Sequence, residues 1–296
     1  MRKRNKGNFE QTAAPLLFLL PNLFVFTVFI IIPAFRGLSM SAFGWGILSE
    51  PVFTGWTNFA ELVRDGVFWR TFANTVVYSV FAVPLSAASA LLLALLLQDN
   101  AMGGVKVFRS LFYLPSLLSM ITVGISWRFL LGDEMGAVNY GLRLMGFTGV
   151  HWLSEALPAM GSVILISVWA GAGYYMVIVL AGLQAIPTEL YEAARIDGAS
   201  AWTIFRRITL PMLRGTMLVV MVLATIASFK AYELIVVLTQ GGPGYATKFI
   251  VQQVYQSAFI EDRMGYASAM SIVLLLLIVA ITSAQFIASG RDQDYE

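Results

Sequence analysis

The chain has 296 residues, of which 58% are hydrophobic and 12% are charged, with a net charge of +2 and a mean hydropathy of +0.76. A water-soluble domain of this length needs far more charge to cover its surface, so the composition excludes that class and indicates an integral membrane protein. Cysteine is absent and there is one histidine, which excludes disulfides and thiolate metal sites and leaves few options for other metal centres.

The first half of the chain holds three long apolar runs. Residues 1–14 are predicted to form a basic cytoplasmic tail before a first run at about 15–35. A cleaved signal peptide is the alternative, but its apolar region usually has only about 7–15 residues, which favours an uncleaved span. The second run covers about 72–97, where Pro84 suggests a kink, and the third covers about 111–131.

Two connections in this half are long. Phe59 to Trp69 is predicted to form an amphipathic helix at the membrane surface. The connection from Gly132 to Leu157 contains the only histidine, His151, which we interpret as an interfacial surface residue.

Three further apolar runs follow, at about 159–183, 213–238 and 266–288. The segment TQGGPGYATK before the last run is rich in turn residues, and residues 289–296 are a second polar tail. The sequence therefore predicts an all-α membrane protein with six transmembrane helices, whose six-span domain covers 15–288.

The distribution of positive charge predicts the orientation of these spans. Eleven of the 19 lysines and arginines lie in the amino-terminal segment, the 98–109 loop, the 184–214 loop and the tail. Seven lie in the opposite connections, and Lys230 lies inside the fifth run. Both termini and the 184–214 loop are therefore expected in the cytoplasm.

The polar stretch between the fourth and fifth runs is predicted to form a helix-turn-helix. Pro187 blocks a helix from upstream and Thr188 can cap the first short helix. Asp197-Gly198 supplies the turn, because glycine accepts the left-handed conformation that ends helices. Ser200 can cap a second short helix, which is expected to stop before Pro211.

This stretch resembles the EAA loop of binding-protein-dependent ABC importer permeases. The positions that match are Glu192-Ala193-Ala194, Gly198, Ile208, Leu210 and Pro211. The resemblance implies that loop 184–212 is a coupling element that docks on an ATPase subunit. The residues implied in that contact are Glu192, Ala193, Ala194, Arg195, Asp197 and Gly198. Glu192 and Arg195 could also pair with each other on one helical face. The alternative is an ordinary basic loop that only fixes topology.

The resemblance extends over nearly the whole chain, and the family more often has Asp where this chain has Glu233. It implies a permease of the sugar and glycerol-phosphate type in a bacterial plasma (inner) membrane, with no cofactor of its own. The implied partners are a second, unlike permease, two ATPase subunits and an extracytoplasmic solute-binding protein. No G-x-x-x-x-G-K-[ST] motif is present, so ATP and Mg would bind the partner ATPase. Nothing indicates a nucleic-acid partner.

Charged and aromatic residues in the spans are candidates for the substrate pathway. These candidates are Asn74, Tyr78, Ser119, Tyr174, Tyr175, Lys230 and Glu233. Lys230 and Glu233 are three residues apart, and a self-neutralising ion pair is the favoured interpretation, with a gate or a substrate contact as the alternative. Tyr174 and Tyr175 can offer rings and hydroxyls to a saccharide. With its cation neutralised, the pathway is expected to suit a neutral sugar or polyol better than glycerol phosphate.

Two other classes of membrane protein remain as alternatives. An intramembrane enzyme is disfavoured by the single histidine and by the absence of cysteine and of G-x-S-x-G. A secondary transporter would want several intramembrane carboxylates or an inverted repeat, and the sequence shows one clear carboxylate.

Overall fold

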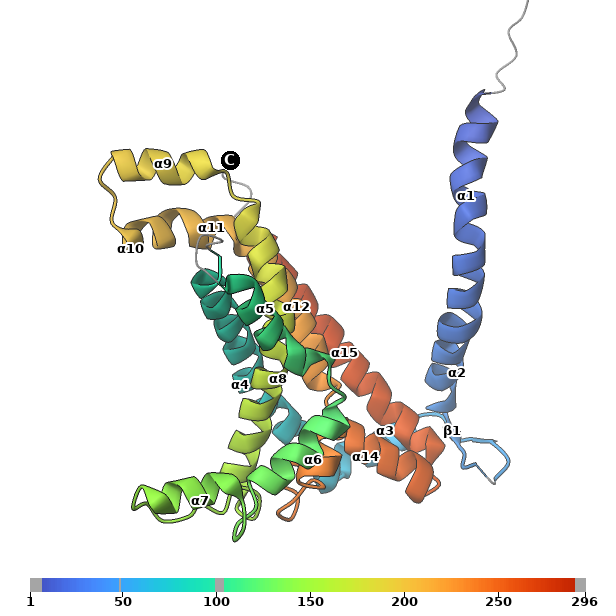
Figure 1. Ribbon diagram of the computed structural model, residues 1–296. Helices are drawn as coiled ribbons and strands as arrows, with labels where there is room; N and C mark the ends of the chain where they lie inside the picture. The colour runs from blue at the N-terminus through green and yellow to red at the C-terminus, as the bar shows by residue number, and fades with distance from the viewer. Residues whose placement is uncertain (1–6, 48, 99–103, 291–296) are drawn as a thin grey trace, which may run out of the picture. The chain divides into compact units, whose positions relative to one another are not determined.

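The computed structural model describes residues 7–47, 49–98 and 104–290, which are almost entirely helical (Figure 1). They fall into two compact units. One unit contains the chain up to Arg64 together with Val254–Ile272, and the other contains Asp65–Gln253 together with the residues from Val273 onward. Each unit is described by itself.

Four helical segments are long and apolar enough to cross a membrane. They are Leu17–Met40, α4 (Gly66–Leu96), α8 (Ala156–Gln184) and α15 (Met264–Gly290). Two bent pairs pass the same test, Val105–Leu117 with Met120–Leu130 and Ala201–Met212 with Arg214–Phe229. The described residues therefore hold from four to six candidate spans, which confirms the prediction of an all-α membrane protein.

The first unit begins with one continuous helical stretch. It consists of α1 (Gly7–Phe26), the π-helical turn η1 (Thr27–Ile31) and α2 (Ile32–Met40). No side chain of Leu17–Met40 is buried within the chain, although most are large and apolar. Such a helix needs lipid or another protein around it.

A small polar framework follows this stretch in the first unit. The strands β1 (Phe43–Gly44) and β2 (Val52–Phe53) pair antiparallel, and α3 (Thr57–Arg64) comes next. The buried Asn58 donates from Nδ2 to the carbonyls of Ser41, at 2.7 Å, and Phe43, at 3.0 Å. These bonds fix the chain where it leaves the first helix.

The predicted helix from Phe59 to Trp69 is interrupted in the structure. The helix α3 ends at Arg64, and Asp65 caps α4 by accepting a hydrogen bond from the Val67 N–H at 2.8 Å. The acidic cap starts a new helix, so Trp69 belongs to α4.

The second unit is built on α4 and α8, which pack along each other and against α12 (Arg214–Phe229). Figure 1 shows α9 (Thr188–Ile196) and α7 (Ala137–Leu144) at opposite ends of α8. The 29 residues of α8 extend over about 43 Å, more than the ~30 Å of a bilayer's hydrocarbon core. The second unit also contains α10 (Ala201–Ile204), η3 (Phe205–Thr209) and α11 (Leu210–Met212), while α14 (Ile250–Tyr255) begins in it and η4 (Gln256–Ile260) belongs to the first unit.

The predicted third span is not one helix. The chain forms α5 (Val105–Tyr113) and a 3₁₀ turn, η2 (Leu114–Leu117), and then bends by 97° into α6 (Met120–Leu130). Pro115 lies in the 3₁₀ turn, and Ser119 starts α6 by accepting from the Ile121 N–H at 3.2 Å. A cap and a proline break the helix inside an apolar run.

The predicted fifth span is interrupted as well. The helix α12 ends at Phe229, and α13 (Glu233–Leu238) begins only after Lys230, Ala231 and Tyr232. The 16 residues of α12 cover about 24 Å, which is shorter than the hydrocarbon core. The six residues of α13 follow this interruption, and they pack against α6.

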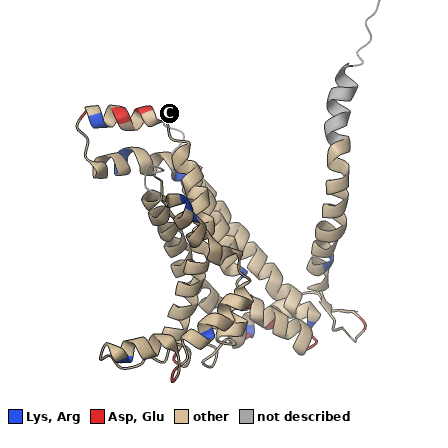
Figure 2. Cartoon of the chain, viewed as in Figure 1, with Lys and Arg blue, Asp and Glu red and all other residues tan. Residues whose placement is uncertain are grey.

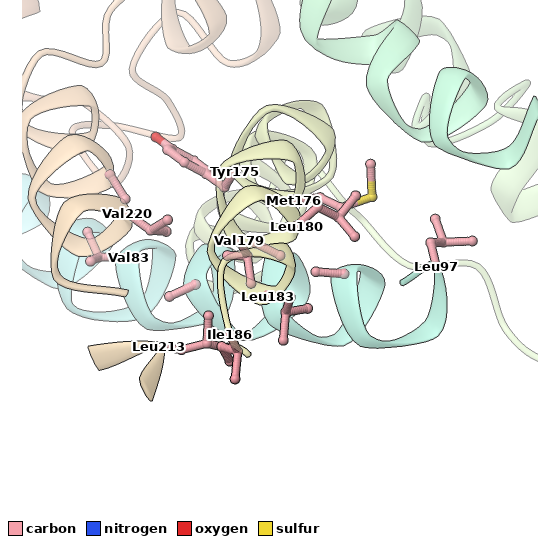
Figure 3. Packing of buried hydrophobic residues seen from close by; sticks show 14 of the residues in the cluster. Val83, Leu97, Tyr175, Met176, Val179, Leu180, Leu183, Ile186, Leu213 and Val220 are labelled. Carbon is pink, nitrogen blue, oxygen red and sulfur yellow. The ribbon is translucent and has the colours of Figure 1, made fainter. Parts of the chain in front are cut away.

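Two apolar cores follow one another along α4 and α8. The first core lies toward α9 and includes Val83, Met176, Val179, Leu183 and Leu213 (Figure 3). The second core lies toward α7 and includes Tyr78, Val163, Ile166, Leu238 and Phe249. Charged residues gather on α9, on η3 and at the α7 end, while the helices between them carry few charges (Figure 2).

Candidate functional site

A cavity of about 370 Å³ opens where the two cores meet. Its walls come from α4, α6, α8, α12 and the interruption between α12 and α13. The lining residues are Tyr78, Ala82, Ser86, Met120, Ser167, Gly171, Tyr175, Ala224, Ala227, Ser228, Lys230, Ala231, Tyr232, Glu233 and Leu234. The site therefore lies inside the apolar part of the bundle, yet many of its lining groups are polar.

Hydroxyl groups make up most of this polarity. Tyr78 and Tyr175 are buried, with exposed fractions of 4% and 8%, and their rings come from facing helices, α4 and α8. Ser167 and Ser228 donate to their own helix backbones, to Val163 at 2.7 Å and Thr225 at 2.9 Å. Those bonds leave the serine oxygens as acceptors, so the cavity offers aromatic faces and hydroxyl acceptors together.

The interruption of the fifth span places two opposite charges on this cavity. Lys230 caps the carboxyl end of α12, and Glu233 is the first residue of α13. Each charge is of the sign that its own helix end favours. The described part of the chain has no ion pair between Lys230 and Glu233, so the favoured interpretation from sequence is not what the structure shows. Both side chains are exposed in the single chain.

The other predicted pathway residues lie elsewhere. Tyr174 is 45% exposed and stacks edge-on against Tyr175, with ring centres 5.3 Å apart, but it does not line the cavity. Asn74 donates to the carbonyls of Tyr245 and Lys248, and so holds the turn-rich loop. Ser119 is the cap of α6. Of the predicted pathway residues, Tyr78, Tyr175, Lys230 and Glu233 line the cavity. Asn74, Ser119 and Tyr174 do not.

Several lining residues were not predicted from the sequence, namely Ser86, Ser167, Ser228 and Tyr232. A signal for some of them exists. The residues 78, 82 and 86 of α4, and 167, 171 and 175 of α8, follow one another at intervals of four. Small or hydroxyl side chains at that spacing form a polar stripe on one helical face.

The helix-turn-helix at the other end of α8 largely has the predicted form. After α9, the N–H of Ala199 bonds to the Ala194 carbonyl at 2.9 Å, and that of Gly198 bonds to the Arg195 carbonyl at 3.1 Å. Gly198 has φ of +73°, which completes a Schellman motif. Ser200 accepts from the Thr203 N–H at 3.2 Å, which confirms its predicted cap.

Two details of this prediction were wrong. Thr188 makes no side-chain cap, because it is already the first helical residue and Pro187 occupies the cap position. The second helix does not stop before Pro211, since the π-helical turn η3 carries the chain into α11. Pro211 lies in the first turn of α11, where a missing N–H is tolerated.

The helix-turn-helix presents an exposed surface of mixed character. Glu192, Ala193 and Arg195 are exposed, and the described residues show no ion pair between Glu192 and Arg195. Ile196 and Trp202 are large apolar residues that are also exposed, and they were not among the residues predicted for this contact. Tyr191 meets Thr209 through their hydroxyls at 3.2 Å, which holds the two helical arms together.

The only histidine lies far along the chain from these residues. His151 is mostly exposed, with Nδ1 3.3 Å from Asp133 Oδ2. A hydrogen bond from Ser154, at 2.7 Å, together with the nearby His151, holds the pKa of Asp133 below its ordinary value, although partial burial opposes this. No group of three metal-ligating side chains occurs among the described residues.

Comparisons with known proteins give one consistent result. Residues 59–291 match the model of a family described as "binding-protein-dependent transport system inner membrane component". The probable ABC transporter permease protein YurN of Bacillus subtilis is 36% identical, over 94% of this chain and 97% of that protein. The trehalose/maltose transport system permease protein MalF of Thermococcus litoralis is 32% identical, over 94% of both chains. A bacterial ABC transporter for the acidic polysaccharide alginate has a chain of similar structure, with a TM-score of 0.84 at 25% identity, covering 96% of this chain and 97% of that one.

Proposed function

The chain belongs to the family of binding-protein-dependent transport system inner membrane components, and from this premise we propose that it forms half of a two-permease pore that imports a saccharide. It is a permease subunit and not an enzyme. Relatives named for trehalose and maltose, lactose and arabinooligosaccharides support the substrate class.

The cavity between the two cores is the observation that carries this proposal. A saccharide needs hydroxyl partners and aromatic faces, and Tyr78, Tyr175, Ser167 and Ser228 bring both into one space. With Lys230 and Glu233 on its wall, the cavity holds one charge of each sign and is neutral overall. A neutral sugar therefore fits better than an anion.

A second permease would complete the site. Lys230 and Glu233 are exposed in the single chain, although they lie between apolar helices. Charges that face lipid are costly, so they call for a protein surface over them. A second, unlike permease placed against this side would close the cavity and form the pore.

The helix-turn-helix is proposed to receive the motion of an ATPase. Glu192, Ala193, Ala194, Arg195, Asp197 and Gly198 are the residues assigned to this contact. All of these residues except the half-buried Ala194 are exposed, and the Schellman turn fixes the conformation of the segment. The chain has no phosphate-binding loop of its own, so ATP and Mg belong to two separate ATPase subunits.

The simplest test is to purify the chain from its native membrane and assay the complex. A second permease and an ATPase should co-purify, and vesicles that contain the complex should take up a sugar only with the solute-binding protein and ATP. Purification of the chain without any ATPase would contradict the proposal.

Membrane topology gives the first prediction. The proposed arrangement has six spans within 15–288, with both tails (1–14 and 289–296) and loop 184–212 in the cytoplasm. An Ala60→Cys variant should react with an impermeant thiol reagent in intact cells, and Ala199→Cys should react only after the membrane is opened. The unmodified chain is the control, because it has no cysteine. Labelling of Ala199→Cys from outside would overturn the orientation.

An anionic solute, such as an acidic saccharide or glycerol phosphate, is the second candidate substrate. It is favoured by one observation, that Lys230 lines the cavity without an ion pair to Glu233 in the described chain.

The second prediction distinguishes a neutral saccharide from an anionic solute as the substrate. Lys230→Met should leave uptake of a neutral saccharide within a few-fold of the unmodified complex. Loss of uptake of an anionic solute that the unmodified complex imports would make Lys230 its ligand and the neutral-sugar proposal wrong.

A further inference from the structure

The helix α7, at the end of α8 away from α9, presents large apolar side chains that the rest of the described chain leaves uncovered. Leu144 is 72% exposed and Phe147, in the loop that follows, is 63% exposed. Tyr140 lies one turn before Leu144, on the same side of the helix, and is exposed too. The opposite side of α7 packs toward the second core through Val138.

These apolar side chains are not on a loose loop. Asn139 is almost completely buried, and its Nδ2 donates to the carbonyls of Asp133, at 3.0 Å, and Val150, at 2.9 Å. Its Oδ1 accepts from the N–H of Val150 and from Nε1 of Trp152. One side chain thus joins both ends of the connection to the middle of α7, so the outward face has a fixed direction.

The charge on α7 comes from Arg143, whose guanidinium group is hydrogen-bonded to backbone carbonyls. Arg143 donates from Nη2 to the Glu134 carbonyl at 2.6 Å, and from Nε to the Asn139 carbonyl. The guanidinium group is therefore held by the preceding loop and by α7 itself, while Arg143 stays exposed beside the uncharged Tyr140, Leu144 and Phe147.

The position of α7 fits a membrane surface. It joins α8 at the end of a helix longer than the hydrocarbon core, where the bilayer gives way to water. On α8 itself Leu157 and Leu165, two turns apart on one face, are exposed apolar residues as a lipid-facing helix requires. Short helices with an apolar face and aromatic residues lie in the interfacial layer of bilayers.

We propose that α7 is a membrane anchor, whose Tyr140, Leu144 and Phe147 insert into the phospholipid leaflet at the end of the bundle opposite the helix-turn-helix. The occupant of this face is lipid, and not the solute-binding protein or the second permease. The anchor would fix one end of α8 in its leaflet while the other end carries α9. This inference does not depend on which solute the permease imports.

The test measures where these side chains lie in reconstituted membranes. Because the chain has no cysteine, Leu144→Cys and Phe147→Cys can each be labelled with a nitroxide in the complete complex, after assembly has been verified by co-purification. Glu134→Cys, an exposed polar position in the same connection, is the matched control, and Leu165→Cys is the bilayer reference. Electron paramagnetic resonance then reports the accessibility of each label to oxygen, which concentrates in lipid, and to a water-soluble nickel chelate.

The expected result at both positions is high accessibility to oxygen, with accessibility to the nickel chelate several-fold lower than at Glu134→Cys and unchanged by the binding protein. Low accessibility to both reagents would mean that protein covers α7. Protection that occurs only after the solute-binding protein is added would identify that protein as the occupant. High accessibility to the chelate would place α7 in water. Each of these three results overturns the lipid anchor.

Discussion

The Glu192→Arg variant is expected to lose substrate-stimulated ATP hydrolysis, which should fall to the unstimulated level of the complex. Glu192 is exposed on α9 with no partner of its own in the described chain, so its charge is available to the proposed ATPase surface. Reversing that charge replaces an attraction by a repulsion at close contact, which costs several kcal/mol where like charges meet. The measurement is ATPase activity of reconstituted complexes with and without loaded binding protein.

The same charge reversal at Glu155, an exposed residue at the other end of α8, is the control and should leave the stimulation of ATP hydrolysis intact.

A second pair of variants tests the backbone conformation of the turn at Gly198. Gly198 has a positive φ but open space around it, so a side chain would be strained by the backbone and not by a clash. Gly198→Val should therefore impair coupling, whereas Gly198→Asn should be tolerated, because asparagine accepts this conformation. Normal stimulation in the Glu192→Arg and Gly198→Val complexes would remove the coupling assignment.

The Tyr175→Ala variant is expected to lose most sugar uptake, by about tenfold or more, because it deletes a hydroxyl and an aromatic face at once. Tyr175 is buried and lines the cavity beside Gly171, whose added Cβ would come within 3.3 Å of the tyrosine ring. The measurement is uptake of radiolabelled sugar into vesicles that contain the complex.

The neighbouring residue supplies the matched control. Tyr174→Ala removes the same atoms from an exposed ring outside the cavity, and should retain uptake. Tyr175→Phe keeps the packing and removes only the hydroxyl, so it should show an intermediate loss. Co-purification and basal ATP hydrolysis confirm that each variant is assembled. Equal losses at positions 174 and 175 would show that the cavity does not distinguish them and would contradict its assignment as the sugar site.

The sequence predicted the positions of the apolar segments well, but it did not predict where the helices within them are interrupted. Hydropathy reports whether a residue prefers lipid, and it located α8 and α15 to within about three residues, while α4 begins at Gly66, ahead of the predicted start near 72. Hydropathy does not report which backbone N–H groups form helical hydrogen bonds. The interruption at Ser119 therefore lay hidden inside an apolar run, as did the one after Phe229, although Lys230 was visible there as an unusual residue.

The sequence also predicted part of the cavity. Chemical type alone identified Tyr78, Tyr175, Lys230 and Glu233, because charged and hydroxyl groups inside spans are unusual. The error about the ion pair had a physical cause. Residues three apart are neighbours on one face of a continuous helix, but α12 ends at Phe229 and α13 begins at Glu233, so Lys230 and Glu233 do not share one helix. Ser119 and Asn74 are also polar residues in or beside the predicted spans. Their side chains, however, form hydrogen bonds with backbone groups and do not line the cavity.

The two helix interruptions divide the wall of the cavity into a part made of continuous helices and a part made of helices that begin beside it. On one side, α4 and α8 pass the cavity as continuous helices; bending α8 would break helical hydrogen bonds, whereas α4 already lacks one at Pro84. On the other side, α6 and α13 begin at the interruptions and are fastened to each other, since Arg128 donates to the Val237 carbonyl at 3.3 Å and Gly124 lies against Val237. Rotation about the backbone of residues 118–119 and 230–232 would swing this pair as one rod without melting a helix. Both points of rotation lie next to the cavity, so movement of α6 and α13 would change the size of the space beside Lys230 and Glu233.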